Sequence, residues 1–197
     1  MDYKIALKQL KFLEKNNTKD IRLAGELWNE DWKTLISIML SAQTRDTTTI
    51  KICENLFKKY NSLKKIASAN LVDIEKEISS VNYYKTKAKN VWMISKILSL
   101  KEIPETIEEL IELPGIGRKT ANVFLSEAKG IPAIGVDTHV FRISKKLKWA
   151  RENTPEKVEL ELKELFPKKY WSLINNTLVK FGQTHSISEE DYILSKI

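Results

Sequence analysis

The chain has 197 residues, of which 42% are hydrophobic, and it carries a formal net charge of +7. A chain of this length can bury one sizeable core or two small lobes. The single cysteine, Cys53, excludes an internal disulfide and any site held by several cysteines. No apolar run approaches the roughly 20 residues of a membrane span, and the N-terminus lacks an apolar signal core, so we expect an intracellular protein.

The basic surplus favours an anionic partner, above all nucleic acid. Charge alone does not decide this, because most of the basic residues are lysines and a lysine-rich proteome would give the same surplus. Apolar residues recur at helical spacing, for example in residues 35–40, 91–98 and 158–166, and strand-like alternation is scarce. The pattern predicts an all-α fold of about ten helices, with Cys53 as a small core residue. The tryptophans fall among apolar positions and are also predicted to be core: Trp28, Trp32, Trp92, Trp149 and Trp171.

Several helix starts can be read directly from the sequence. Thr106 precedes two glutamates and predicts an N-cap with acidic residues in the first turn. Thr154 precedes Pro155, which suits the first position of a helix, and Asp137 stands before another helical run. The Gly- and Pro-containing stretch 130–135 is the best candidate for a crossing between two lobes.

Residues 113–120 read Leu-Pro-Gly-Ile-Gly-Arg-Lys-Thr and predict a tight turn between two helices. The first helix is expected to end near Glu112, because Pro114 prevents it from continuing. Gly115 and Gly117 can take the positive φ angles that a very tight turn requires. The N–H groups at the start of the second helix are then suited to bind a phosphate oxygen. An ordinary helical corner with a glycine-rich turn is the alternative interpretation.

The whole octapeptide resembles the helix-hairpin-helix motif of the endonuclease III family of DNA glycosylases. Other segments of that family appear in its order: Leu-Ser-Ala-Gln-Thr-Arg-Asp at 40–46, Tyr-Lys-Thr-Lys-Ala at 84–88, and Val-Asp-Thr-His-Val-Phe-Arg at 136–142. The resemblance covers nearly the whole chain and implies two helical lobes with the active site in the cleft between them. It implies a six-helix domain at 22–132 that carries the hairpin (about 107–129), and a second helical domain formed by 1–21 and 133–197.

Lys119 and Asp137 are the candidate catalytic residues, and both lie at predicted helix starts. The positive end of the helix dipole and the neighbouring Arg118 disfavour a protonated amine at Lys119, and a nucleophile must be neutral. Asp137 has an alternative role as an N-cap, which is compatible with catalysis because backbone N–H groups keep a carboxylate ionised. The resemblance implies that Lys119 forms a Schiff base and that Asp137 stabilises the cationic sugar. It also implies a bifunctional enzyme, since relatives that only remove the base lack this lysine.

The resemblance implies a second set of residues, which hold the DNA around a flipped nucleotide. Gln43 matches the residue that enters the vacated space, with an exposed helix-closing residue as the alternative. Tyr83 matches a wedge side chain, often leucine in the family; whether Tyr84 is the wedge instead, or Tyr83 a core residue, stays open. His139 is either a contact near the active site or a packed helix residue. The hairpin residues implied to bind DNA are Leu113, Gly115, Ile116, Gly117, Arg118 and Thr120.

The chain departs from the family in its last segment. Many relatives have four cysteines there that hold a [4Fe–4S] cluster, whereas residues 181–197 contain none. Thiolates are the expected ligands of such a cluster, so we expect no cluster, with Ser186 where the first cysteine would stand. No other cofactor is implied, although the hairpin leaves room for a monovalent cation. Apolar packing is then expected to hold the lobe together, from Phe181, Ile187, Tyr192, Ile193 and Leu194.

The function implied is a bifunctional DNA glycosylase and apurinic/apyrimidinic lyase of base excision repair that removes oxidised pyrimidines. One alternative is a glycosylase for oxidised guanine or for mismatched thymine or uracil. Another is a helix-hairpin-helix module that binds DNA without catalysis, which explains the hairpin glycines but neither Lys119 nor Asp137. The expected partner is double-stranded DNA with damaged bases or abasic sites. We expect a cytoplasmic, nucleoid-associated monomer that has no contact with membranes.

Overall fold

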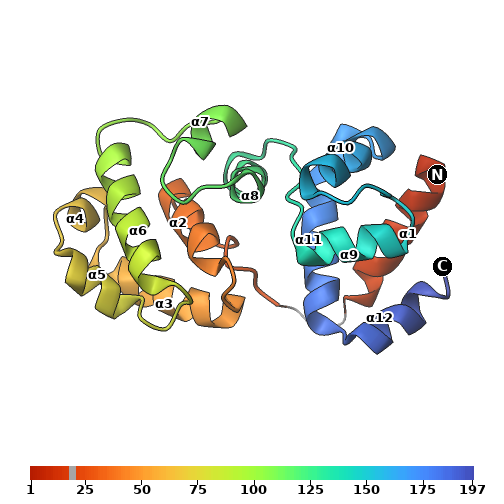
Figure 1. The fold of residues 1–197 in the computed structure, drawn as a ribbon, viewed down its shortest axis with the longest axis horizontal. Helices are drawn as coiled ribbons and strands as arrows, with labels where there is room; N and C mark the ends of the chain where they lie inside the picture. The colour runs from red at the N-terminus through yellow and green to blue at the C-terminus, as the bar shows by residue number, and fades with distance from the viewer. Residues whose placement is uncertain (18–20) are drawn as a thin grey trace. The chain divides into compact units, whose positions relative to one another are not determined.

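A computed structural model describes residues 1–17 and 21–197, and every regular element within them is a helix (Figure 1). These residues form twelve α-helices and one short 3₁₀ helix without any β-strand, which confirms the all-α prediction. The helices outnumber the expected ten because short pieces such as α4 (Leu63–Ala67) and α7 (Ile107–Ile111) stand as separate elements. None of the helices in this described part is long and apolar enough to cross a membrane.

The chain divides into two compact units. Unit 1 comprises Met1–Ile21 and Ile131–Ile197, and unit 2 comprises Arg22–Gly130. The division follows Gly130, which ends helix α8 in the left-handed conformation with φ 62°. A glycine is suited to this position because it adopts positive φ without steric penalty.

Unit 2 is organised around helix α2, which is buried along nearly its whole length because α3 and α8 pack against it. Figure 1 shows α8 almost along its axis while α2 lies across the view, so the two helices cross steeply. Helix α6 packs on α4, on α5 and on part of α2. The remaining bounds are α2 (Asp31–Ser41), α3 (Asp46–Lys59), α5 (Leu71–Glu77), α6 (Tyr84–Leu98) and α8 (Arg118–Lys129).

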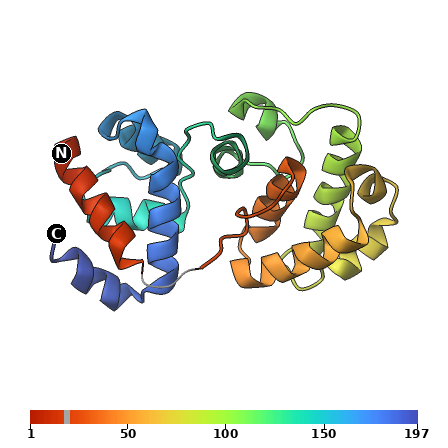
Figure 2. The ribbon, with the colours of Figure 1, turned by 180° about the vertical axis from the view of Figure 1, so that it is seen from behind.

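Unit 1 is organised around helix α11, which contacts both α1 and α9 (Figure 2). Its core contains the fully buried Phe181 and Phe166, and the ring of Phe166 meets the indole of Trp149 edge to face at 4.9 Å. Burial of such aromatic rings supplies much of the hydrophobic stabilisation of a small unit. The bounds are α1 (Tyr3–Asn16), α9 (Thr138–Lys146), α10 (Pro155–Leu165), η1 (Lys168–Tyr170), α11 (Trp171–Thr184) and α12 (Ile187–Leu194).

The predicted helix starts are confirmed. The side chains of Thr106, Asp137 and Thr154 each accept a hydrogen bond from a backbone N–H in the first turn of the following helix. Pro155 occupies the first position of α10, and Cys53 is buried in α3 as expected. Burial raises the pKa of the Cys53 thiol, so this cysteine is an unreactive core residue.

The predicted burial of the tryptophans is only partly correct. Trp32 and Trp149 are buried, whereas Trp28, Trp92 and Trp171 are half-buried. A tryptophan ring is large, so a ring at the edge of a small core can still expose one face. The indole of Trp28 donates to the carbonyl of Ala24 at 2.6 Å.

Ion pairs hold helix α12 to α9, and the apolar packing that the sequence predicted is only partly present, with Ile193 and Leu194 half-buried. Ile187 and Tyr192 are exposed, at 61% and 64% of their surface. Glu190, by contrast, is fully buried and accepts bonds from Arg142 Nε at 3.1 Å and from Lys146 Nζ at 3.2 Å. A buried carboxylate is tolerated only when it is paired in this way. Of the predicted apolar contacts, Phe181 is the one that is fully buried.

We therefore predict that Glu190→Gln destabilises unit 1. The variant keeps the size of the side chain but removes the charge that Arg142 and Lys146 share. Breaking a buried ion pair costs up to about 3–5 kcal/mol, and we expect about 1–3 kcal/mol here because both cations reach solvent. Urea unfolding measures the change, with the exposed Glu14→Gln of α1 as the matched control. Equal stability of the two variants would show that α12 is held by something else.

Candidate functional site

The predicted hairpin is present between α7 and α8, and its two glycines have different roles. Gly115 has φ 78°, and an added Cβ would collide with the side chain of Asn90 on α6. Leu113 and Ile116 are buried, and the N–H of Ile116 donates to the carbonyl of Leu113 at 3.1 Å to close the turn. The inner side of the turn is therefore held by the burial of Leu113 and Ile116 and by the contact of Gly115 with α6.

Gly117 corrects one expectation, because its φ is −95° and not positive. The turn needs only one left-handed residue, which is Gly115. An added Cβ at Gly117 would meet no atom of the protein within 4 Å, so internal packing does not require glycine here. Gly117 is nevertheless the N-cap of α8 and offers no side-chain cap to its first turn. The helix therefore presents uncapped backbone N–H groups beside open space, which suits a close approach by a phosphate oxygen.

Lys119 lies in the first turn of α8 and is half-buried. Within the part of the chain that the structure describes, its ammonium has no hydrogen bond or ion pair. The amine is therefore not committed to a structural role. The neighbouring Arg118 is half-buried and Thr120 is buried. Among the predicted hairpin contacts, Leu113, Ile116 and Thr120 can thus reach DNA through their backbone only.

Asp137 lies in unit 1 and caps α9. Its Oδ1 accepts the N–H of Val140 at 2.8 Å, while Oδ2 has no hydrogen-bond partner among the described residues. His139, in the first turn of α9, packs against Gly182 of α11, where an added Cβ would collide with the imidazole. The imidazole Nδ1 also lies 3.3 Å from a guanidinium nitrogen of Arg142. These contacts favour the interpretation of His139 as a packed helix residue.

Gln43 and Tyr83 share an uncommon backbone conformation. Both are exposed non-glycine residues in the left-handed region, with φ 56° and 58°. This conformation costs roughly 1–2 kcal/mol per residue, and such strain gathers at functional sites. Tyr83 is 68% exposed, which rules out a core role, whereas Tyr84 is half-buried in the first turn of α6.

The two strained residues lie on loops that are bonded to each other. The side-chain amide of Asn82 donates to the carbonyl of Gln43 through a short hydrogen bond. The backbone N–H of Asn82 donates to Thr44 Oγ1 at 3.1 Å. The structure therefore brings the loops of Gln43 and Tyr83 together, although the two residues are far apart in the sequence of unit 2.

Lys87 completes this arrangement, although the sequence did not predict a role for it. In the sequence it is one of three alternating lysines, with Lys85 and Lys89. It is only 7% exposed, and its ammonium donates to the carbonyls of Leu40 and Ala42 at 2.8 and 2.5 Å. A signal for this burial did exist. Lys87 precedes Val91 and Ile94 at helical spacing, so it belongs to the buried face of α6.

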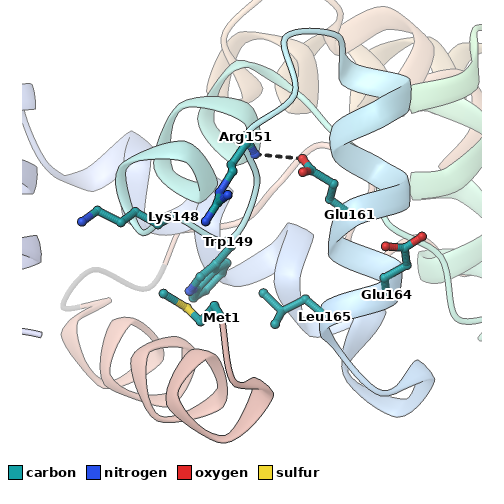
Figure 3. A pocket seen from close by; sticks show the side chains of 7 residues that line it. All are labelled: Met1, Lys148, Trp149, Arg151, Glu161, Glu164 and Leu165. Atoms are coloured by element: carbon teal, nitrogen blue, oxygen red, sulfur yellow. Dashed lines mark hydrogen bonds between the residues drawn. The ribbon is translucent and has the colours of Figure 1, made fainter.

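A pocket of about 420 Å³ opens in unit 1, but it contains none of the predicted site residues (Figure 3). Charged side chains such as Glu161 form part of its rim, and Glu161 accepts the backbone N–H of Arg151 at 2.8 Å. The pocket gives no reason to move the candidate site away from the hairpin. It is lined by Met1, Lys148, Trp149, Arg151, Glu161, Glu164 and Leu165.

The residues of this chain do not fit a four-cysteine iron–sulfur cluster. Such a cluster needs several thiolates, and Cys53, the one cysteine, is buried inside α3 of unit 2. Ser186 instead caps α12, in a reciprocal pair of hydrogen bonds with Glu189. The segment that would carry the cluster in relatives is therefore a capped helix.

Comparison with known proteins places this geometry in context. The model of the HhH-GPD superfamily of base excision DNA repair proteins matches residues 36–168. Endonuclease III of Thermotoga maritima is 41% identical over 157 residues, which is 78% of this chain and 74% of that protein. Endonuclease III of Bacillus subtilis is 38% identical over 78% of this chain and 72% of its own. A solved structure of a trapped endonuclease III–DNA covalent intermediate has a TM-score of 0.85 at 34% identity, covering 94% of this chain and 88% of that one.

The two hairpin glycines yield a paired prediction. Gly115→Ala should lower the free energy of unfolding by about 1–2 kcal/mol or more, because alanine is strained at positive φ and collides with Asn90. Gly117→Ala should leave stability within about 0.5 kcal/mol of the wild type, or raise it slightly, because alanine tolerates its φ. Urea unfolding measures both. Similar losses in the two variants would contradict the separate roles assigned to the glycines.

Proposed function

The chain belongs to the HhH-GPD superfamily of base excision DNA repair proteins, as a homologue of endonuclease III, and we propose that it excises damaged bases through a Schiff base on Lys119 and then cuts the strand. The observation that carries this proposal is the position of Lys119. Its amine is uncommitted and lies two residues beyond Gly117, in the first turn of a helix with an open, uncapped start. A nucleophile and a phosphate-binding turn thus lie side by side on one element.

The proposed reaction begins at the amine of Lys119. Once the damaged nucleotide has left the base stack, Nζ of Lys119 bonds to C1′ and the bond from C1′ to the base breaks. The sugar ring opens to a Schiff base, a proton leaves C2′, and the bond from C3′ to the 3′ phosphate breaks. Water then releases the lysine and the unsaturated aldehyde. Each step exchanges one bond for another and requires no oxidant or reductant.

Asp137 is assigned the electrostatic part of the reaction. Positive charge develops on the sugar as the base departs, and a fixed carboxylate lowers the energy of that state. The bond from Val140 N–H holds one oxygen, which keeps the carboxylate oriented, while the other oxygen is available to face the sugar. The partial charge of the α9 N-terminus adds to the stabilisation of the anion.

The proposed substrate is duplex DNA that carries an oxidised pyrimidine or an abasic site, bound by a monomer at the nucleoid. Gln43 fills the space of the flipped nucleotide, and Tyr83 wedges against the opposite base. Both are exposed, and their loops are bonded to each other, which supports a joint role. Excision rates on thymine glycol, 8-oxoguanine and mismatched thymine or uracil test the specificity, with thymine glycol expected to be fastest.

We also propose that the enzyme works without an iron–sulfur cluster. No step of the reaction passes through such a group. The ion pairs of Glu190 with Arg142 and Lys146 provide the attachment of α12 that the cluster loop would otherwise supply.

Borohydride trapping tests the central assignment. A duplex with an abasic site or thymine glycol, incubated with the wild type and borohydride, should yield a covalent protein–DNA adduct by reduction of the Schiff base. Lys119→Gln should abolish both the adduct and strand cleavage. The exposed Lys101→Gln of unit 2, which loses the same charge, should retain both. A full yield of adduct from Lys119→Gln would contradict the assignment of the nucleophile.

A further inference from the structure

The ammonium of Lys87 is fully occupied by acceptors at the end of α2. It has three N–H donors, and three oxygens receive them: the carbonyls of Leu40 and Ala42, and Thr44 Oγ1 at 3.3 Å. The last carbonyls of a helix lack partners within it, and the negative end of the helix dipole favours a cation there. Lys87 thus caps the C-terminal end of α2, although it lies on α6 and 45 residues beyond Ala42 in the chain.

The same bonds fix the backbone on either side of Gln43. Lys87 holds the carbonyl of Ala42, which precedes Gln43, and Asn82 holds the carbonyl of Gln43 itself. A strained, left-handed residue persists only when its surroundings leave it no alternative. With both flanking carbonyls bonded, the peptide units around Gln43 cannot rotate toward a more common conformation without losing these bonds.

Tyr83 and the hairpin are tied to the same stretch of α6. Tyr83 is the N-cap of α6, Lys87 lies one turn later, and Asn90 lies almost one further turn along, on the same helix face as Lys87. Asn90 is the residue against which Gly115 of the hairpin packs. The first two turns of α6 therefore contact each predicted DNA-binding element of unit 2.

We propose that Lys87 is a positioning residue for base flipping, which holds the loops of Gln43 and Tyr83 in the conformation that enters the duplex. This inference rests on the proposed function. Its physical basis is preorganisation: loops already ordered in the free protein need not be ordered when the lesion is bound. Without the ammonium, Gln43 relaxes toward a common backbone conformation, and part of the binding energy must restore it.

Burial supports a specific role for this lysine. Desolvation lowers the pKa of Lys87, so the protein keeps a cation where its charged form is disfavoured. A hydroxyl supplies one donor and a side-chain amide supplies two, whereas the ammonium supplies a separate donor to each of the two carbonyls and to the hydroxyl of Thr44.

The test compares two duplexes under single-turnover conditions. In one, thymine glycol faces adenine; in the other, the same strand faces an abasic analogue, so that no partner base has to be separated or wedged. Lys87→Met should lose about tenfold or more in excision rate on the paired duplex and less than about threefold on the other. A general loss of structure would lower both rates equally, and that result would overturn the proposal.

Two further variants sharpen the comparison. Lys89→Met removes an exposed lysine of the same helix, so any weakening of DNA binding should affect both duplexes alike and leave their ratio unchanged. Asn82→Ala removes the side-chain bond to the carbonyl of Gln43 from an exposed position, so the variant should fold even where Lys87→Met does not. It should show the same selective loss, and its effect should not add fully to that of Lys87→Met because both act on one loop. An unchanged ratio in Asn82→Ala would overturn the proposal.

Hydrogen exchange of the free protein separates this inference from the proposed function. In Lys87→Met, peptides containing Gln43 and Tyr83 should exchange faster, while peptides of α8 keep their protection. If the wild type excises from neither duplex, the proposed function fails and the exchange data alone decide whether Lys87 orders the two loops. Unchanged exchange in both loops would refute the positioning role even for an active enzyme.

Discussion

The buried ammonium of Lys87 is the interaction that we propose to order the loops of Gln43 and Tyr83 in unit 2. It joins the end of α2 to the first turns of α6, and through them it connects Gln43, Tyr83 and the hairpin at Gly115. These segments are far apart in the chain, and each loop alone is short and exposed. The bonds from one ammonium to two backbone carbonyls hold these segments in a fixed relative position, because each bond restricts both a distance and a direction.

Helix N-termini supply the chemistry in both units. At the start of α9 the backbone N–H groups and the helix dipole stabilise the carboxylate of Asp137. At the start of α8 the open backbone N–H groups attract phosphate. Helix N-termini therefore orient the carboxylate of Asp137 in unit 1 and offer a phosphate site beside Lys119, the proposed nucleophile, in unit 2. Within unit 1, the ion pairs of Glu190 with Arg142 and Lys146 attach α12 to α9.

The local features were predictable from the sequence, and the features that depend on distant contacts were not. The caps at Thr106, Asp137 and Thr154 follow from interactions within four residues, so the pattern of the chain suffices to locate them. The hairpin was recognised for the same reason, although the φ of Gly117 was wrong because the turn needs only one left-handed residue. Lys87 was missed because its partners lie on another helix. The ion pairs that attach α12 were not predicted, because Glu190 pairs with Arg142 and Lys146 of α9. These partners lie more than 40 residues away in the chain, where no local pattern shows them.

In the proposed reaction, the amine of Lys119 bonds to the sugar. Digestion of the borohydride-trapped wild-type adduct, followed by mass spectrometry of the DNA-linked peptide, tests this bond directly. We predict that the deoxyribose fragment is attached to Nζ of Lys119, in the peptide that follows the hairpin. Attachment to the N-terminal amine of Met1 or to another lysine, with Lys119 unmodified, would contradict it.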